Sequence, residues 1–156
     1  MHEPIASDER AEGPAPLEPV MDAAALDGFL RAEFPQMFRD GDVFVIEAVG
    51  PGAARVRFEP TEHHLRPGGT VSGPSLFTLA DVGAYIVTLA HVGPVALAVT
   101  TSLTINFLHR PRPGPLRCDA RILKRGKRLV VTDVAIADAR ATLVAHATAT
   151  YSVPPR

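Results

Sequence analysis

The sequence predicts an α+β fold in which an antiparallel sheet wraps around one central helix. Three observations lead to this prediction. Apolar residues recur at helical spacing near the start of the chain, a segment in the middle is apolar on nearly all sides, and six segments alternate as strands do. Their order along the chain is helix, two strands, buried helix and four strands.

The composition fits one soluble globular domain. The 156 residues are 46% hydrophobic and carry 16 basic against 17 acidic side chains, so a general nucleic-acid binder, which needs a clear basic excess, is not expected. One cysteine excludes an internal disulfide. No apolar run approaches the roughly 18 residues of a membrane helix, and no signal-peptide pattern is seen at the start. We therefore expect a cytoplasmic protein that does not bind membranes.

Residues 1–20 are expected to form a disordered tail. They contain four prolines, five acidic side chains against one arginine, and no apolar period, so they cannot bury enough surface to offset the entropy of ordering. The domain itself, over 21–156, begins with a helical pattern. Asp22 is a candidate N-cap, apolar residues follow at three- and four-residue steps, and Pro35 ends the helix.

Six segments have the character of strands because apolar and polar residues alternate along them between turn signals such as Gly50-Pro51-Gly52 and Arg125-Gly126-Lys127. They are 43–49, 54–59, 97–108, 116–122, 129–139 and 142–153. In the third of these, residues 97, 99, 101, 103, 105 and 107 are expected on one face.

A second helix follows a loop over 60–73. Ser72 is its candidate N-cap, and Pro74 falls in the first turn, where proline is tolerated. The helix is expected to run to residue 90 or 91, before Gly93-Pro94. It should be buried, because apolar side chains surround its axis.

The buried helix carries one carboxylate, Asp81. The side chains three and four residues away are Phe77, Thr78, Ala84 and Tyr85, so no basic residue of the helix pairs with it. Burying an acid without a partner is costly, which favours a functional role. The alternative is that Asp81 bonds a hydroxyl such as that of Thr78, or points into solvent.

The start of the same helix offers a place for a developing oxyanion. A helix N-terminus presents unpaired N–H groups and the positive end of the helix dipole. Gly73 lets a carbonyl group approach the backbone without a side chain in the way. Because Pro74 has no N–H, Gly73 and Ser75 are the available backbone donors. The alternative is a capped helix after a turn, with no function of its own.

Gly73 and Asp81 of one chain cannot serve the same carbonyl group. They are eight residues apart, a rise of about 12 Å along an α-helix, which is beyond the reach of an aspartate side chain. If both act in one reaction, Gly73 comes from one subunit and Asp81 from another. A two-fold homodimer would then contain two such sites.

The segment 64–81 reads His-Leu-Arg-Pro-Gly-Gly-Thr-Val-Ser-Gly-Pro-Ser-Leu-Phe-Thr-Leu-Ala-Asp. It resembles the signature of hotdog-fold acyl-CoA thioesterases of the phenylacetate-pathway (PaaI-like) type, His-x-Asn-Pro-x-Gly-x-Val-His-Gly-Gly with an acid seven residues on. The resemblance extends over 21–153 and includes the order of elements. It departs at Arg66, Ser72 and Pro74, where the family has Asn, His and a second Gly.

The resemblance implies a hotdog domain that hydrolyses acyl-CoA as a homodimer, assembled further into a homotetramer, without a metal or redox cofactor. It implies that the Gly73 N–H polarises the thioester carbonyl. It also implies that Asp81 of the opposing subunit activates water or attacks directly, and that Thr100 positions the water. The residues expected to bind the substrate are His64, Arg66, Ser72, Ser75, Phe77 and Tyr85.

Basic side chains in two turns are expected to hold the coenzyme A phosphates. They are Arg110, Arg112, Lys124, Arg125, Lys127 and Arg128. A solvated basic hairpin is the alternative for each of them. Likewise Phe77, Tyr85 and Phe107 either line an acyl channel or simply pack in the core.

Two other functions stay open at this point. One is a non-catalytic acyl-CoA-binding hotdog protein, in which the three departures have removed the geometry that activates water. The other is a hotdog hydratase or dehydratase, which is disfavoured because no His paired with an acid stands out in the central region.

Overall fold

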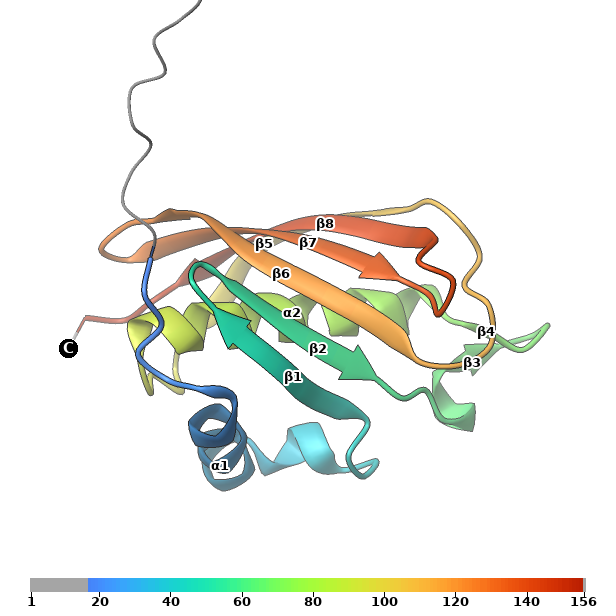
Figure 1. The fold of residues 1–156 in the computed structure, drawn as a ribbon, viewed down its shortest axis with the longest axis horizontal. Coiled ribbons are helices and arrows are strands. Elements are labelled where there is room, and N and C mark those ends of the chain that lie inside the picture. Colours follow the sequence, from blue (N-terminus) through green and yellow to red (C-terminus); the bar gives the residue numbers. More distant parts are fainter. Residues whose placement is uncertain (1–16, 156) are drawn as a thin grey trace, which may run out of the picture.

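The computed structural model describes residues 17–155 (Figure 1). The predicted tail over 1–20 therefore lies mostly outside the described residues. Of its last residues, Val20 donates its N–H to the carbonyl oxygen of Ala90 at 2.7 Å. This bond attaches the chain to the end of the central helix just before the domain begins.

The first helix, α1 (Ala23–Glu33), begins at the predicted cap: the Asp22 carboxylate accepts a hydrogen bond from the Ala25 N–H at 2.8 Å. Leu26 and Leu30 are fully buried beneath it. Pro35 stops the helix and opens a short 3-10 turn, η1 (Pro35–Phe38), which was not predicted as a separate element. α1 packs against the first strand and the central helix.

All six predicted strands are present, in one antiparallel sheet of order β1-β2-β6-β7-β8-β5. Their bounds are β1 (Phe44–Gly50), β2 (Ala53–Phe58), β5 (Val99–Phe107), β6 (Leu116–Arg125), β7 (Leu129–Ala137) and β8 (Leu143–Ser152). β1 and β5 are the edge strands. Within the predicted loop lie a 3-10 turn, η2 (Glu62–His64), and a small ribbon of β3 (Leu65–Arg66) and β4 (Thr70–Val71).

The central helix, α2 (Gly73–Val92), lies along one face of the sheet (Figure 1). Ser72 caps it as predicted, its hydroxyl oxygen accepting from the Ser75 N–H at 3.3 Å. By length and composition alone this 20-residue helix could cross a membrane, so the expectation that no run is long enough was wrong. Within the fold, 72% of the 18-residue apolar stretch of α2 is buried, as in the core helix of a globular domain. A sheet wrapped around one long helix is the predicted hotdog fold.

α2 comes very close to the sheet at Gly83. A Cβ atom there would lie 2.5 Å from Sγ of Cys118 on β6, a distance that no real Cβ contact tolerates. The Cys118 thiol is fully buried and donates to the Leu79 carbonyl oxygen at 3.6 Å. Burial raises the pKa of the Cys118 thiol, so this side chain acts as a small packed group beneath the helix.

β5 departs from the predicted alternation. A β-bulge between Thr100 and Ser102 shifts its register against β8. Thr100 is consequently turned toward α2, while Val99 is 55% exposed. Placing Val99 on the same face as Leu103 was therefore wrong, because the extra residue of a bulge reverses the alternation on one side of it.

Candidate active site

The Asp81 carboxylate on α2 is bound by two hydroxyl groups of the sheet. Thr100 on β5 and Tyr151 on β8 each donate to Asp81 Oδ1 at 2.6 Å. The Tyr151 hydroxyl also lies 3.1 Å from the main-chain oxygen of Asp81. Thr78, the partner suggested by helical spacing, instead donates its hydroxyl to the Pro74 carbonyl at 3.0 Å.

Tyr151 belongs to the candidate site through its bond to Asp81, but it was not predicted from the sequence. Its ring stacks on Tyr85 with centroids 5.7 Å apart. Burial and the neighbouring Asp81 charge raise the pKa of Tyr151, so the hydroxyl keeps its proton and acts as a donor. The alternation along β8 indicates only that Tyr151 shares the buried face with Ala147 and Ala149. That its hydroxyl meets Asp81 depends on the pairing of β5 with β8.

Asp81 lies between two cavities. The first, of about 500 Å³, is bounded by α2, η1, η2, β1 and β2. Its wall contains the aromatic rings of Phe34, Phe44, Phe58 and Phe77. The second, of about 270 Å³, lies toward α1, β5 and β8. The predicted residues Tyr85 and Thr100 line this second cavity together with Tyr151 and Asp81.

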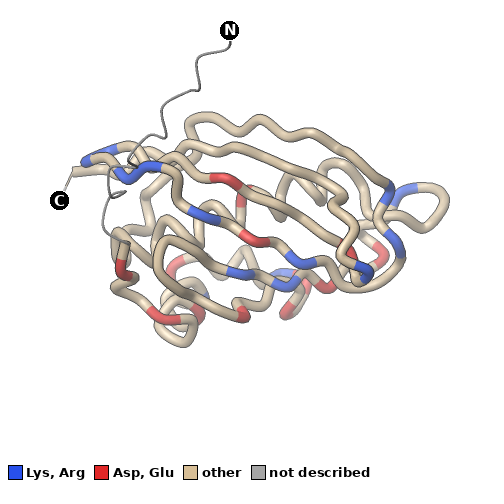
Figure 2. The backbone as a smooth tube through the Cα atoms, turned by 45° about the horizontal axis from the view of Figure 1, so that its top comes forward, with Lys and Arg blue, Asp and Glu red and all other residues tan. Residues whose placement is uncertain are grey.

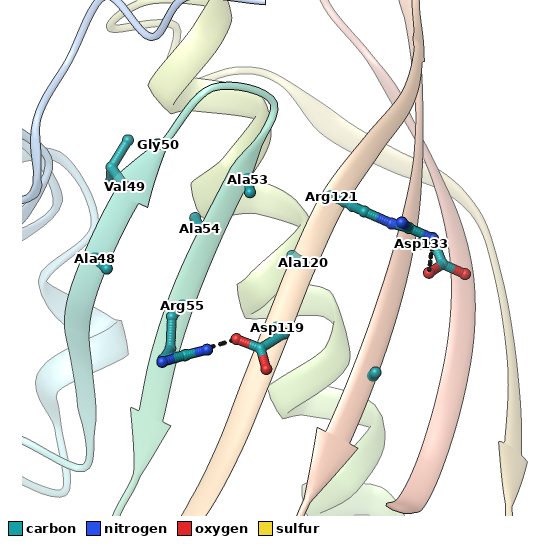
Figure 3. Close-up of a pocket in the computed structure, with 11 residues that line it drawn as sticks. Ala48, Val49, Gly50, Ala53, Ala54, Arg55, Asp119, Ala120, Arg121 and Asp133 are labelled. Atoms are coloured by element: carbon teal, nitrogen blue, oxygen red, sulfur yellow. Dashed lines mark hydrogen bonds and ion pairs between the residues drawn. The ribbon is translucent and has the colours of Figure 1, made fainter. Parts of the chain in front are cut away.

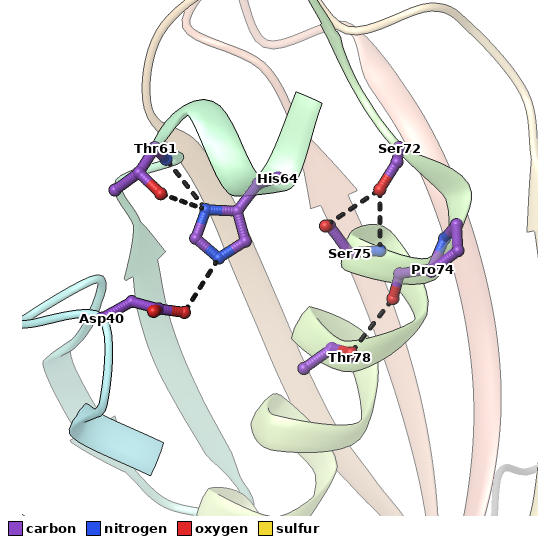
Figure 4. A network of polar contacts seen from close by, with 7 residues as sticks. All are labelled: Asp40, Thr61, His64, Ser72, Pro74, Ser75 and Thr78. Atoms are coloured by element: carbon purple, nitrogen blue, oxygen red, sulfur yellow. Dashed lines mark hydrogen bonds and ion pairs between the residues drawn. The ribbon is translucent and has the colours of Figure 1, made fainter. Parts of the chain in front are cut away.

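His64 forms part of the first cavity, across from the start of α2 (Figure 4). The Thr61 N–H donates to His64 Nδ1 at 2.8 Å, so in the neutral ring Nε2 carries the proton. That nitrogen lies 3.9 Å from Oδ2 of Asp40. Three predicted substrate-binding residues, His64, Ser75 and Phe77, thus share a cavity with Asp81.

Gly73 opens onto a different cavity, of about 310 Å³, which Arg66 and Arg110 also line. Of the two backbone donors expected here, the Ser75 N–H is taken by the Ser72 hydroxyl oxygen. The Gly73 N–H meets no acceptor within residues 17–155. A Cβ at Gly73 would lie 3.4 Å from the Phe107 ring, so Phe107 packs beside the helix start. Gly73 is therefore the free donor at the helix start.

The predicted basic residues fall into two groups at opposite ends of β6 (Figure 2). Arg110 and Arg112 precede this strand, and the other four surround the turn that follows it. β6 is ten residues long, or about 33 Å at the rise of a strand. One chain therefore does not bring the two groups together.

A cavity of about 590 Å³ lies on the opposite face of the sheet from α2 (Figure 3). Two ion pairs border it, Arg55 with Asp119 at 2.7 Å and Arg121 with Asp133 at 3.4 Å. No predicted site residue lines this cavity. The side chains predicted to bind or react with the substrate all lie on the α2 side of the sheet or at the ends of its strands.

Residues 68–145 match the family model described as the Thioesterase superfamily, and the chain belongs to this family. A solved structure from Silicibacter sp. TM1040, classed as a thioesterase, is 43% identical. It aligns with a TM-score of 0.81 over 90% of this chain and 97% of that one. The resemblance to hotdog thioesterases is thereby confirmed.

Two other solved structures are informative. A phenylacetic acid degradation-related protein from Ralstonia eutropha JMP134, classed as a thioesterase, is 28% identical, with a TM-score of 0.71 over 80% of this chain and 98% of its own. A protein from Streptococcus mutans UA159, solved bound to acetyl CoA, is 28% identical, with a TM-score of 0.65 over 72% of this chain and 90% of its own. Family membership supports thioester hydrolysis in general.

Proposed function

We propose that this protein hydrolyses acyl-CoA thioesters at sites shared between the two subunits of a homodimer. One observation supports the proposal most directly: within one chain, the two groups needed for hydrolysis lie in different places. The carboxylate of Asp81 and the free N–H of Gly73 open onto different cavities. They are also about 12 Å apart along α2. Each chain alone thus offers half of a hydrolytic site.

The edge strand β5 supports a specific pairing of the two subunits. Near one end of β5, Thr100 bonds Asp81, and at the other end Phe107 lies beside Gly73. In a two-fold dimer, β5 of one subunit can pair antiparallel with β5 of the other. The Thr100 end of each strand then lies beside the Phe107 end of its partner. This pairing brings Gly73 of one subunit toward Asp81 of the partner subunit.

The exposed side chains of this edge also favour pairing. An edge strand leaves a row of backbone donors and acceptors unpaired, which makes it a template for another strand. Large apolar side chains on and beside β5 are exposed by 47% to 79%: Leu97, Val99, Phe107 and Leu108. A second copy of the chain would cover them.

The reaction follows from these groups. The Gly73 N–H binds the thioester carbonyl oxygen, and Asp81 Oδ2 of the partner subunit takes a proton from water as the water oxygen attacks the carbonyl carbon. The new C–O bond leaves an oxyanion on the Gly73 donor, a contact worth about 3 kcal/mol in the transition state. Collapse breaks the C–S bond, and the proton passes from Asp81 to the departing sulfur. The products are a free acid and the coenzyme A thiol.

The cavities around Asp81 and Gly73 support a place for each end of the substrate. The cavity of about 500 Å³ beside Asp81, with its aromatic wall, takes the acyl group. Arg66 and Arg110 line the Gly73 cavity, and guanidinium groups there could bind phosphate oxygens through paired hydrogen bonds. Because Val130 pairs with Tyr151, the basic turn after β6 lies at the Asp81 end. In a shared site the two basic groups therefore come from different subunits and flank one coenzyme A.

We also propose a cytoplasmic location and further assembly of the dimer into a homotetramer. Both follow from the composition and the sequence resemblance. The departures at Arg66, Ser72 and Pro74 favour one competing function, an acyl-CoA-binding protein without turnover, because they fall in the loop beside the oxyanion donor.

Hydrolysis assays against a panel of acyl-CoAs separate these two functions. The wild-type protein is expected to release free coenzyme A from at least one of them. Asp81→Asn and Asp81→Ala each lower the rate by about 10²–10⁴-fold, because the general base is lost. Asp27→Asn, a change at a part-exposed carboxylate on α1, serves as the control and keeps the wild-type rate.

Two results would count against the proposal. If turnover survives both Asp81 substitutions, Asp81 is not the catalytic group. If coenzyme A binds but no acyl chain is ever hydrolysed, the protein is a binding protein.

A further inference from the structure

The Asp81 carboxylate is held through only one of its two oxygens. The hydroxyls of Thr100 and Tyr151 both donate to Oδ1, each at 2.6 Å. Within the described part of the chain, 17–155, no donor meets Oδ2. Short hydrogen bonds to an ionised group are among the strongest in proteins. One oxygen is thus fixed, while the other is left available.

The sheet register explains how the two hydroxyls converge. Thr100 on β5 lies directly opposite Tyr151 on β8. A regular β5 that buries Leu103 would turn Thr101 toward α2 and Thr100 away from it. The bulge between Thr100 and Ser102 reverses this order, which is the way bulges re-aim side chains beside functional sites.

Tyr151 has the properties of a fixed donor. It is 3% exposed, and its ring lies nearly parallel to that of Tyr85, at 23°. The hydroxyl therefore has little room to move. Burial, and then the charge of Asp81, raise the pKa of Tyr151, which keeps the proton on the hydroxyl. The distance to Oδ1, 2.6 Å, is shorter than the 3.1 Å to the main-chain oxygen of Asp81, so the carboxylate is the preferred acceptor.

We infer that Tyr151 is a positioning residue for Asp81, and that Oδ2 is the oxygen that takes the proton from water. The inference rests on the proposed function. Tyr151 itself does not touch the substrate. Together with Thr100 it stabilises the charged carboxylate and sets the direction in which Oδ2 points. Loss of the Tyr151 hydroxyl leaves the carboxylate freer to rotate, because one of its two donors is gone.

The test compares Tyr151→Phe with Thr132→Val. The first keeps the stacked ring and removes one donor to Asp81. The second removes a fully buried hydroxyl that donates to the Ala149 carbonyl at 3.0 Å, away from Asp81. Both variants therefore lose one buried hydrogen bond, but only Tyr151→Phe loses a bond to Asp81. For Tyr151→Phe, kcat is expected to fall about tenfold or more, with KM changed less than about twofold. Thr132→Val is expected to leave kcat unchanged.

A second readout does not require turnover. Carbon-13 NMR of the aspartate side chains reports the surroundings of the Asp81 carboxylate, whose signal is assigned by its loss in Asp81→Asn. At a fixed pH, the chemical shift of this signal is expected to change in Tyr151→Phe, because one donor to Oδ1 is lost, and to stay the same in Thr132→Val. If Asp81→Asn inactivates the enzyme while Tyr151→Phe matches the wild type in kcat and in the Asp81 signal, the proposed function stands and the positioning role is overturned. If the wild-type protein hydrolyses no acyl-CoA, the proposed function fails, and the Asp81 signal alone decides whether Tyr151 holds the carboxylate.

Discussion

At the scale of single residues, Asp138 shows how a buried carboxylate organises the backbone around it. It accepts hydrogen bonds from the N–H groups of Arg140 at 3.0 Å, Thr142 at 3.1 Å and Arg112 at 3.4 Å. The carboxylate thereby ties the turn between β7 and β8 to the segment that leads into β6. Burial opposes its charged form, but the three donors outweigh this effect, and the pKa of Asp138 is lowered.

The lowered pKa predicts how stability depends on pH. Unfolded aspartate titrates near pH 3.9, and folded Asp138 titrates below that. The stabilisation is therefore complete above the unfolded value and is lost as the pH falls through the folded value. Urea denaturation between about pH 2 and 7 is expected to show a smaller loss of stability on the acid side for Asp138→Ala than for the wild type. Asp42→Ala, at an exposed ion-paired carboxylate, is the control. An identical pH dependence for Asp138→Ala and wild type would contradict this role.

The residues of the candidate site differ in how well the sequence indicates them. Asp81 and Gly73 could be selected locally, because an acid in an apolar helix and a glycine at a helix start are visible within a few positions. Tyr151 could not, because it reaches Asp81 from 70 positions away through the pairing of β5 with β8. Only the register of those strands shows that its hydroxyl meets the carboxylate.

At the scale of elements, packing of α2 on the sheet depends on Gly83. The predicted Cβ–Sγ distance of 2.5 Å for an alanine at this position means that the helix or Cys118 must move. Alanine is the better helix former, so local propensity and packing oppose each other here. Packing dominates because both groups are buried.

Gly83→Ala is therefore expected to lower the free energy of unfolding by about 1–3 kcal/mol. Gly28→Ala on α1 is the matched control, since a Cβ there meets nothing within 4 Å, and it should raise stability by up to about 1 kcal/mol. Adding Cys118→Ala to Gly83→Ala removes the clashing sulfur and should recover part of the loss. Urea denaturation of the four proteins measures these changes. A Gly83→Ala protein as stable as the wild type would show that the contact is not tight.

Elements whose signals are local were predicted best. The caps Asp22 and Ser72, and the glycines and prolines at the turns, placed both helices and all six strands. The bulge in β5 was not predicted, because an extra residue leaves no mark in a polar run such as Thr100-Thr101-Ser102. The ribbon of β3 and β4 was also missed, since two-residue strands are too short to show alternation.

At the scale of the whole molecule, the proposed chemistry needs two chains. The length of α2 between Gly73 and Asp81, and the exposed edge of β5, argue for the same two-fold arrangement from independent observations. The rise of α2 between Gly73 and Asp81 is enough to predict a site shared between two subunits. That β5 is an edge strand and can pair with a second copy follows only from the strand order, which a single sequence does not specify.

Complementation between two inactive variants tests the shared site directly. Asp81→Asn removes the base. Gly73→Pro removes the oxyanion donor, and the fold should accept it, because the first position of a helix tolerates proline and Ser72 already has the extended backbone that precedes one, with ψ at 155°. Each variant alone is expected to be a dimer with little activity.

When the two variants are mixed in equal amounts and allowed to exchange subunits, about half of the dimers become mixed, and each mixed dimer contains one intact site out of two. The activity should then rise to about a quarter of the wild-type value per subunit. Native mass spectrometry on the same sample counts the mixed dimers. If mixed dimers form and no activity returns, or if the wild-type protein remains a monomer, Gly73 and Asp81 do not act together across a subunit interface.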